Sequence, residues 1–344
     1  MNANASPAGR DNAFDLIRLL LAVLVVYGHA YQVGGFGDDG FAHLFKMQTN
    51  AGPFAVTGFF GISGFLVTRS FALRADAVGF IRARLLRILP GFYLALVFTA
   101  FCIAPLVARH NPAAGPWDVS SALRYVWHDA GVRITEPNVG DVLRGLPVTE
   151  SINGSLWTLF PELCCYGLVL ALGALGLFRT GRVNVLLLAG ALLMLHVAMV
   201  VVPRDFIIAP VFLQLSGWSP YVLAFTAGSA AYCYKDEVLA SSRSWAMWLV
   251  ATLVLLYFGG WSLLGPVALT LGLIQAAHAF RITLPVDLSY GTYLLHFPVL
   301  QLMAALQLNR HGVGPYFAAA LIATGALAAL SWFAVERPFL RLKA

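Results

Sequence analysis

FDLIRLLLAVLVVYGHA, residues 14–30, decides the fold class because it is almost wholly apolar and further apolar runs of similar length follow it. The whole sequence is 59% hydrophobic and only 11% charged, which is far from the composition of a soluble domain. A run of about 20 apolar residues is long enough to cross a bilayer as a helix. The sequence therefore predicts an all-α, polytopic integral membrane protein.

Ten apolar segments predict about ten transmembrane helices. They lie at residues 14–34, 53–73, 88–108, 155–178, 183–202, 210–233, 244–258, 261–279, 286–306 and 316–335. The seventh and eighth form one long apolar stretch, which we divide at Gly259 and Gly260 because it is too long for one span and paired glycines favour a turn. We expect residues 1–13 to form a cytoplasmic tail and residues 14–344 a single transmembrane domain.

The distribution of Lys and Arg predicts the orientation, because cytoplasmic loops of membrane proteins are enriched in both residues. With both termini in the cytoplasm, the inner loops carry about twice as many basic residues as the outer loops. The long loop at residues 109–153 then lies outside. Its aromatic residues Trp117, Tyr125 and Trp127 either stack on sugar rings or anchor the loop at the membrane interface.

Several classes of site and partner receive no support. The formal net charge of +6 indicates no nucleic-acid partner, because no nucleic-acid-binding motif accompanies it. The four cysteines include no CxxC pair, so the sequence predicts neither a metal site nor a disulfide framework. His196 and His278 match no motif and are expected to be packing residues.

Arg18 and His29 lie near the two ends of the opening stretch, eleven residues apart. In a helix this spacing amounts to three turns with about 20° left over, so both side chains share one face about 16 Å apart. Ionisable groups are costly inside a membrane, so the shared face favours a polar cavity that crosses much of the bilayer. The alternative is that Arg18 reaches the headgroups, with Asp15 as its partner, while His29 forms a hydrogen bond within the bundle.

Two further stretches suggest contact with a ligand. GFFGISGFLVTRS, residues 58–70, contains small residues that permit close approach of another helix or of a ligand: Gly58, Gly61, Ser63 and Gly64. RARLLRILPGFY, residues 82–93, places Arg84 and Arg87 about one turn apart on one face at the predicted inner surface. This pair suits bidentate binding of phosphates, and topology signalling or contact with anionic lipid also explains it. Glu162 lies inside the fourth predicted span, where a carboxylate indicates function or a buried partner.

Six short motifs now stand in a particular order along the chain. They are Arg-x10-His ending at His29, FFGISGF, RLLRILP, WTLFPE, SYGTYLLHFP at residues 289–298 and ERP at residues 336–338. In these motifs and their order the chain resembles the acyltransferase 3 family of bacterial membrane O-acyltransferases. The resemblance implies transfer of an acyl group, commonly acetyl, from cytoplasmic acyl-CoA to a hydroxyl of an envelope carbohydrate or a related, lipid-linked acceptor. It also implies a multi-pass protein of the bacterial inner membrane.

The resemblance assigns roles to residues at the matched positions. It implies His29 as the essential histidine, and Glu162 as a second catalytic residue that orients or charge-balances it. The residues expected to bind the acetyl-CoA or other acyl-CoA donor are Arg18, Arg69, Arg84, Arg87 and Ser63. The residues expected to bind the acceptor are Trp157, Tyr293 and His296. A neutral imidazole suits removal of a hydroxyl proton, and arginines suit the phosphates of coenzyme A.

Two other functions are weighed against acyl transfer. Polar groups inside a ten-helix bundle would also mark the path of a transporter or flippase for an envelope glycan or acyl carrier. A non-catalytic membrane scaffold would leave the spacing of Arg18 and His29 unexplained. Many members of the resembled family carry a fused SGNH hydrolase-like domain, and this sequence ends at Ala344 without one. We therefore expect either a separate extracytoplasmic partner protein or a membrane domain that suffices alone.

Overall fold

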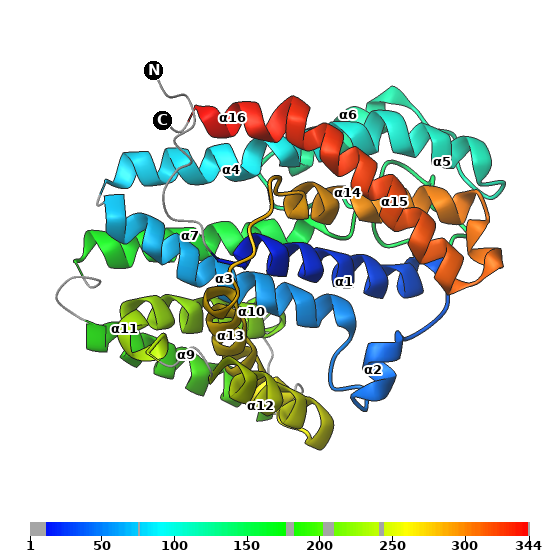
Figure 1. Ribbon diagram of the computed structural model, residues 1–344. Coiled ribbons are helices and arrows are strands. Elements are labelled where there is room, and N and C mark those ends of the chain that lie inside the picture. Colours follow the sequence, from blue (N-terminus) through cyan, green and yellow to red (C-terminus); the bar gives the residue numbers. More distant parts are fainter. Residues whose placement is uncertain (1–11, 75, 177–181, 202–209, 241–243, 343–344) are drawn as a thin grey trace.

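The computed structural model describes residues 12–74, 76–176, 182–201, 210–240 and 244–342, which form helices and connecting loops without a β-strand (Figure 1). The all-α prediction is confirmed for this part of the chain. The helices are α1 (Phe14–Gly34), α2 (Gly40–Leu44), α3 (Ala51–Arg74), α4 (Ala77–Phe98), α5 (Ala104–His110), α6 (Val119–Asp129), α7 (Leu159–Ala174), α9 (Arg182–Val201), α10 (Pro210–Cys233), α11 (Lys235–Val238), α12 (Ser244–Phe258), α13 (Trp261–Ala279), α14 (Ser289–Ala305), α15 (Val313–Ser331) and α16 (Arg337–Arg341). Short π-helical turns, Thr99–Ile103 and Trp332–Glu336, join α4 to α5 and α15 to α16.

Within the described residues, seven helical segments are long and apolar enough to cross a membrane, and α12 is a shorter apolar helix. The seven are Phe14–Gly34, Ala51–Leu73, Ala77–His110, Leu156–Ala174, Arg182–Val201, Trp261–Ala279 and Val313–Arg341. Each of the ten predicted segments coincides with a helix over its described residues. The chain is therefore a polytopic membrane protein, while ten as the number of spans stays a prediction.

The predicted division of the long apolar stretch is confirmed, because α12 ends at Phe258 and α13 begins at Trp261. The two residues between them, Gly259 and Gly260, have φ angles of 95° and 101°. Glycine adopts this left-handed conformation without the steric penalty of a side chain. The glycine pair therefore makes the tight turn of a helical hairpin.

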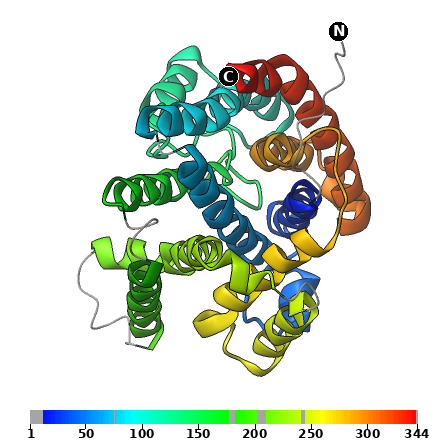
Figure 2. The same cartoon turned by 60° about the vertical axis from the view of Figure 1, so that its left-hand side comes forward.

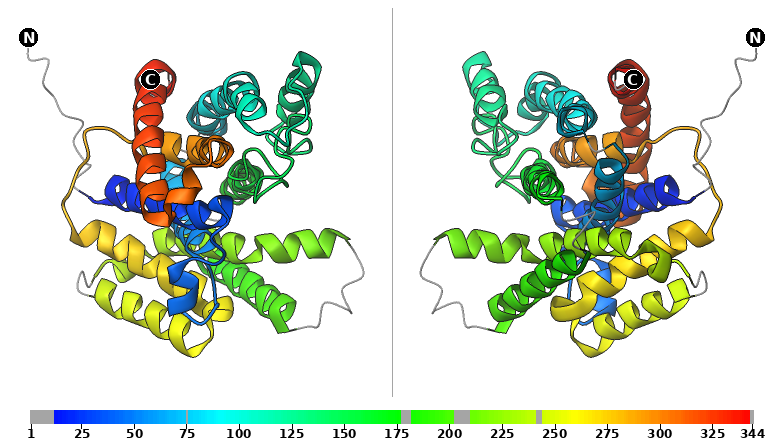
Figure 3. Two further views of the ribbon diagram at one scale, coloured as in Figure 1. Left: turned by 90° about the vertical axis from the view of Figure 1, so that its right-hand side faces the viewer. Right: turned by 90° about the vertical axis from the view of Figure 1, so that its left-hand side faces the viewer.

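The helix α3 lies in the middle of the molecule, with α1, α4, α7, α10 and α13 around it (Figure 2). The helices α9, α10, α12 and α13 form the lower part of the molecule in both views of Figure 3. The turn from α3 to α4 and the helix α16 lie on the left of Figure 1, whereas α2 and α5 lie on the right. These two groups of connections lie at opposite ends of the bundle, as the predicted topology requires.

Glycines allow α3 and α10 to cross in close contact, which confirms the close helix approach predicted for this stretch. A side-chain carbon on Gly64 would overlap the carbonyl oxygen of Phe225, and one on Gly228 would overlap the carbonyl oxygen of Gly61. Backbones can approach this closely only where a side chain is missing. The glycines of FFGISGF therefore serve the packing of α3, while Ser63 between them forms a hydrogen bond to Glu162 of α7.

The long segment between α5 and α7 is folded rather than an open loop. In α6, Tyr125 is only 1% exposed and packs into the main apolar core. The indole Nε1 of Trp117 donates a hydrogen bond to the carbonyl oxygen of Ala100 at 3.0 Å. Trp127, by contrast, is 81% exposed. Of the three aromatic residues predicted to stack on a sugar or anchor the loop, Tyr125 is thus a core residue.

Candidate active site

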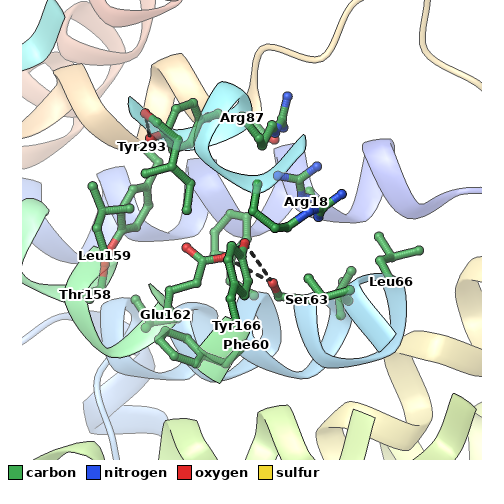
Figure 4. A pocket seen from close by; sticks show the side chains of 18 residues that line it. Arg18, Phe60, Ser63, Leu66, Arg87, Thr158, Leu159, Glu162, Tyr166 and Tyr293 are labelled. Carbon is green, nitrogen blue, oxygen red and sulfur yellow. Dashed lines mark hydrogen bonds between the residues drawn. The ribbon is translucent and has the colours of Figure 1, made fainter. Parts of the chain in front are cut away.

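Two adjacent cavities lie within the helix bundle. The first, which we call the arginine cavity, has a volume of about 110 Å³ and is lined by Arg18, Arg84 and Arg87 together with apolar and hydroxyl side chains (Figure 4). The second, the histidine cavity, has a volume of about 260 Å³ and is lined by His29 and Trp157. Arg18 and His29, predicted to share one polar face of α1, therefore open into two different cavities.

Three residues line both cavities and form the partition between them: Val56, Thr158 and Tyr293. The hydroxyl groups of Thr158 and Tyr293 are 2.6 Å apart, and Tyr293 also donates to the carbonyl oxygen of Ser155 at 3.2 Å. Figure 4 shows Arg18 and Arg87 at one end of the arginine cavity and the Thr158–Tyr293 pair at the other. Movement of this hydroxyl pair would join the two cavities.

An ion-pair network at the arginine end joins α1, α4 and the loop that precedes α14. Arg87 Nη2 lies 2.5 Å and Arg18 Nη1 3.2 Å from the same carboxylate oxygen, Asp287 Oδ2. The hydroxyl of Ser289 donates to the other oxygen of Asp287 at 2.6 Å. The three charged side chains are only 12–21% exposed, so water screens the pairs weakly. The partner of Arg18 is thus Asp287, where the sequence suggested Asp15.

Arg84 lies on the same helix as Arg87 but contacts a different set of groups. Its Nη2 is 3.3 Å from the hydroxyl oxygen of Ser70, and its guanidinium lies 5.9 Å from the centre of the Tyr166 ring. Glu162 accepts hydrogen bonds from Ser63 at 3.0 Å and from Tyr166 at 2.6 Å (Figure 4). This end of the arginine cavity therefore combines a cation with a hydroxyl-bound carboxylate.

The histidine cavity contains one histidine that is bound to a second. His29 Nδ1 lies 2.7 Å from His296 Nε2, and the two rings are nearly parallel, at 8° to each other. His296 is fully buried, and its Nδ1 faces the carbonyl oxygens of Thr292 and Tyr293 at 3.1 Å and 2.9 Å. The hydroxyl of Ser155 lies 3.3 Å from His296 Nε2. The histidine pair is thus anchored to the backbone of α14.

A proline in α14 explains how the segment before α7 reaches the histidine pair. Pro298 has no N–H, so it leaves the carbonyl oxygen of Leu294 without its helical donor. The side-chain amide of Asn153 supplies the missing hydrogen bond to that oxygen at 3.0 Å. This bond fixes the segment that carries Ser155 and Thr158 against α14, next to His296 and Tyr293.

The sequence-predicted site residues fall into these two cavities with three exceptions. The arginine cavity takes Arg18, Ser63, Arg84, Arg87 and Glu162, the histidine cavity takes His29 and Trp157, and Tyr293 lines both. Arg69 lines neither cavity, and His296 reaches the site only through His29. Glu162, considered as the partner of His29, lines the other cavity, and His296 forms the hydrogen bond instead.

The sequence analysis did not find Asp287 or the pairing of Thr158 with Tyr293. Asp287 stands two residues before the SYGTYLLHFP motif, at the start of a predicted span. An acidic residue at such a place could have been matched to the basic face of α1 or α4 by charge alone. Among the described residues, no cluster of three His, Cys, Asp or Glu side chains has the arrangement of a metal site.

Comparison with known proteins identifies the family. A model of an acyltransferase domain, the acyltransferase 3 type, matches residues 11–336. The chain belongs to the acyltransferase 3 family. Nodulation protein 10 of Rhizobium leguminosarum bv. viciae is 28% identical over 384 residues, which cover 99% of this chain and 96% of that protein. The O-acetyl transferase of Shigella phage Sf6 is 26% identical over 350 residues, which cover 96% of each chain.

No solved structure matches the chain. As an acyltransferase 3 protein, the chain is a membrane-embedded O-acyltransferase and therefore an enzyme. This membership decides between the two predicted functions in favour of acyl transfer over transport.

Proposed function

We propose that this enzyme transfers an acetyl group from acetyl-CoA, bound from the cytoplasmic side of the bacterial inner membrane, to a hydroxyl of an envelope carbohydrate. The observation that carries the proposal is the pair of cavities with opposite chemistry that share one wall. An anionic donor and a hydroxyl-bearing acceptor could approach this wall from its two sides. The acyl group would cross only the partition of Val56, Thr158 and Tyr293.

The arginine cavity suits the donor. Coenzyme A carries several negatively charged phosphates, and guanidinium groups bind phosphates with paired, charge-assisted hydrogen bonds. Three arginines line this cavity, and the carboxylate of Asp287 pairs with two of them. The third, Arg84, keeps no carboxylate within ion-pair distance among the described residues. Arg84 is therefore the strongest candidate for a direct phosphate contact.

The histidine cavity suits an uncharged, hydroxyl-rich acceptor. Its lining includes the carboxylates of Asp38 and Asp39, the amides of Gln32 and Asn50, and the ring of Trp157, without a Lys or Arg. Asp39 is already used, because it caps both α2 and α3 through the backbone N–H groups of residues 42 and 51. The other polar groups can exchange hydrogen bonds with sugar hydroxyls, and the Trp157 ring can pack on a sugar face. Acidic side chains disfavour an anionic acceptor here.

The reaction needs a base at the acceptor hydroxyl, and His29 supplies it in this proposal. The hydroxyl oxygen attacks the thioester carbonyl carbon while His29 takes the hydroxyl proton. A C–O bond forms, the C–S bond breaks, and the thiolate of coenzyme A leaves and receives the proton from the imidazolium. The thioester reaches His29 only if the Thr158–Tyr293 pair moves aside, since its hydroxyls close the partition.

The first prediction tests His29 as the base. His29→Ala should lower the acylation rate by about 100- to 10,000-fold, the usual contribution of a general base, while binding of acetyl-CoA is kept. The test compares acetylation of the envelope glycan in cells that lack the gene, carry it, or carry His29→Ala. Acetyl-CoA binding is then measured on the purified proteins in lipid nanodiscs.

A matched control uses His43, an exposed histidine of α2 that lines neither cavity. His43→Ala should keep the wild-type level of acetylation. Wild-type acetylation by well-folded His29→Ala would contradict the proposal. Loss of both activity and protein abundance in His29→Ala alone would instead indicate a packing role.

A further inference from the structure

We propose that His296 is a positioning residue, which accepts the Nδ1 proton of His29 and so leaves His29 Nε2 free to act as the base. A neutral imidazole carries one proton, on either nitrogen, and only the unprotonated nitrogen can take a proton from a hydroxyl. The partner of the other nitrogen decides which form is present. The inference rests on the proposed function and assigns His296 a role other than contact with the acceptor.

The protonation of His296 itself follows from its surroundings. Its Nδ1 lies 3.1 Å from the carbonyl oxygen of Thr292 and 2.9 Å from that of Tyr293. Carbonyl oxygens only accept hydrogen bonds, so Nδ1 must carry the proton and donate it. His296 Nε2 is then an acceptor, and the hydroxyl of Ser155 at 3.3 Å can donate to the same nitrogen.

The state of His29 follows from that of His296. His29 Nδ1 is 2.7 Å from the acceptor nitrogen of His296, so Nδ1 carries the proton and donates it. His29 Nε2 is left with its lone pair. This nitrogen lies 3.9 Å from the position that a Cβ on Gly52 would occupy, and Gly52 and His29 both line the histidine cavity. The lone pair therefore lies on the side of the ring where the acceptor is proposed to bind.

Packing holds both rings in this arrangement. The ring of Phe297 stands edge-on to His29 at a centroid distance of 5.0 Å, and the two histidine rings are nearly parallel. On α1, a side-chain carbon at Gly28 would lie 2.8 Å from the backbone nitrogen of Gly52, so α1 and α3 are close at this point. The His29 ring thus has a fixed hydrogen-bond partner and a fixed orientation.

His296 gains no proton during the proposed transfer. His29 Nε2 takes the hydroxyl proton and His29 Nδ1 keeps its own, so the positive charge lies on His29 and is shared through the hydrogen bond to neutral His296. The carboxylates of Asp38 and Asp39 line the same cavity and favour that charge. Loss of the acceptor at His296 should therefore slow the chemical step and leave donor binding intact.

The test compares two replacements of similar volume. Gln retains an oxygen near the position of His296 Nε2 that can accept from His29, whereas Leu offers no acceptor. His296→Leu should lower kcat by about 100-fold or more, with the KM for acetyl-CoA unchanged within about twofold. His296→Gln should recover at least about tenfold of that loss. The assay measures coenzyme A release by the full-length protein in nanodiscs, with native envelope glycan as acceptor.

A control histidine separates positioning from packing. His196 is 3% exposed and bonds to the hydroxyl of Ser219 and the carbonyl oxygen of Ser262, outside both cavities. His196→Leu should lower the thermal midpoint and leave kcat per folded molecule unchanged. An unchanged kcat in folded His296→Leu, or equal kcat losses in the Leu and Gln variants, would overturn the inference.

The wild-type protein gives a second measurement that does not depend on a variant's folding. With ¹⁵N-labelled histidine, the His29 signals, identified by their absence from His29→Ala, should show Nδ1 protonated and Nε2 bare. The reverse pattern would overturn the inference. If His29→Ala stays active, the proposed base itself fails. If His29→Ala is inactive while His296→Leu keeps its kcat, only the positioning role fails.

Discussion

Arg84 and Arg87 differ at the scale of single residues, although both lie on α4 one turn apart and line the same cavity. Arg87 pairs with Asp287 at 2.5 Å, and both side chains are at most 15% exposed. Arg84 bonds to the neutral hydroxyl of Ser70. We infer that Arg87 chiefly holds α4 against the loop before α14, while Arg84 is available to the donor.

The residue-scale prediction separates these two roles. Arg84→Ala should weaken binding of acetyl-CoA by about 10- to 100-fold, since a charge-assisted hydrogen bond contributes about 1.5–3 kcal/mol. Arg84→Lys should restore part of it, because a lysine cannot form the paired contact. Arg87→Ala should instead lower the thermal midpoint, by the equivalent of up to about 3 kcal/mol, because Asp287 keeps only Arg18. Equilibrium dialysis with acetyl-CoA and thermal melting in nanodiscs measure both effects, and an exchange of the two outcomes would contradict this division.

The sequence could predict what lies along one helix, because spacing alone sets the faces of α1 and α4. The shared face of Arg18 and His29, the glycines of α3 and the turn at Gly259 belong to this class. Contacts between segments far apart in the sequence were not predictable in the same way. Asp287 meets Arg18 only after the chain has folded, and nothing in the spacing of Glu162 says that His296 takes the place beside His29.

Prolines shape the site at the scale of helices, because each one frees a carbonyl oxygen that a polar side chain from another segment then binds. In α14, Pro298 frees Leu294, which Asn153 binds. In α13, Pro266 frees Ser262, which His196 of α9 binds at 2.6 Å. His196 therefore has a structural role, in agreement with the expectation that it is a packing residue.

The element-scale prediction uses Asn153 and Pro298 as a pair. Asn153→Ala should destabilise the protein by about 1–3 kcal/mol, because a buried carbonyl loses its donor. Pro298→Ala restores an N–H that can bond to Leu294 within the helix, so Asn153→Ala should cost less in that background. Thermal melting of the wild type, both single variants and the double variant forms a complete cycle. Equal costs of Asn153→Ala in the two backgrounds would show that the bond to Leu294 is unimportant.

Charge is distributed unevenly over the whole molecule. Arginines surround the cavity nearer the start of α1, whereas the cavity at His29, three turns further along, has carboxylates and no Lys or Arg in its lining. The turn from α3 to α4 and the helix α16 lie at one end of the bundle, and α2 and α5 lie at the other (Figure 1). An enzyme that takes an anionic donor from one side of a membrane and a sugar from the other needs this polarity.

The whole-molecule prediction concerns which end of the bundle faces the cytoplasm. Single cysteines at Ala77, the first residue of α4, and at Ser120 in α6 occupy exposed positions. Both are introduced after the four native cysteines are replaced by Ser, because Cys102 and Cys164 are themselves exposed. If Lys and Arg mark the cytoplasmic side, a membrane-impermeant thiol reagent added to intact cells should label only Ser120→Cys, and Ala77→Cys only after the membrane is opened.

Two controls make the labelling decisive. The cysteine-free protein must retain acetyl transfer, and both single-cysteine proteins must be labelled fully in detergent. Labelling of Ala77→Cys alone in intact cells would invert the molecule and place the arginine cavity on the outer side, where cytoplasmic acetyl-CoA does not reach it. Labelling of both positions from outside would contradict the placement of these segments on opposite sides. Labelling of Ser120→Cys alone gives the donor cavity the cytoplasmic access that the proposed reaction requires.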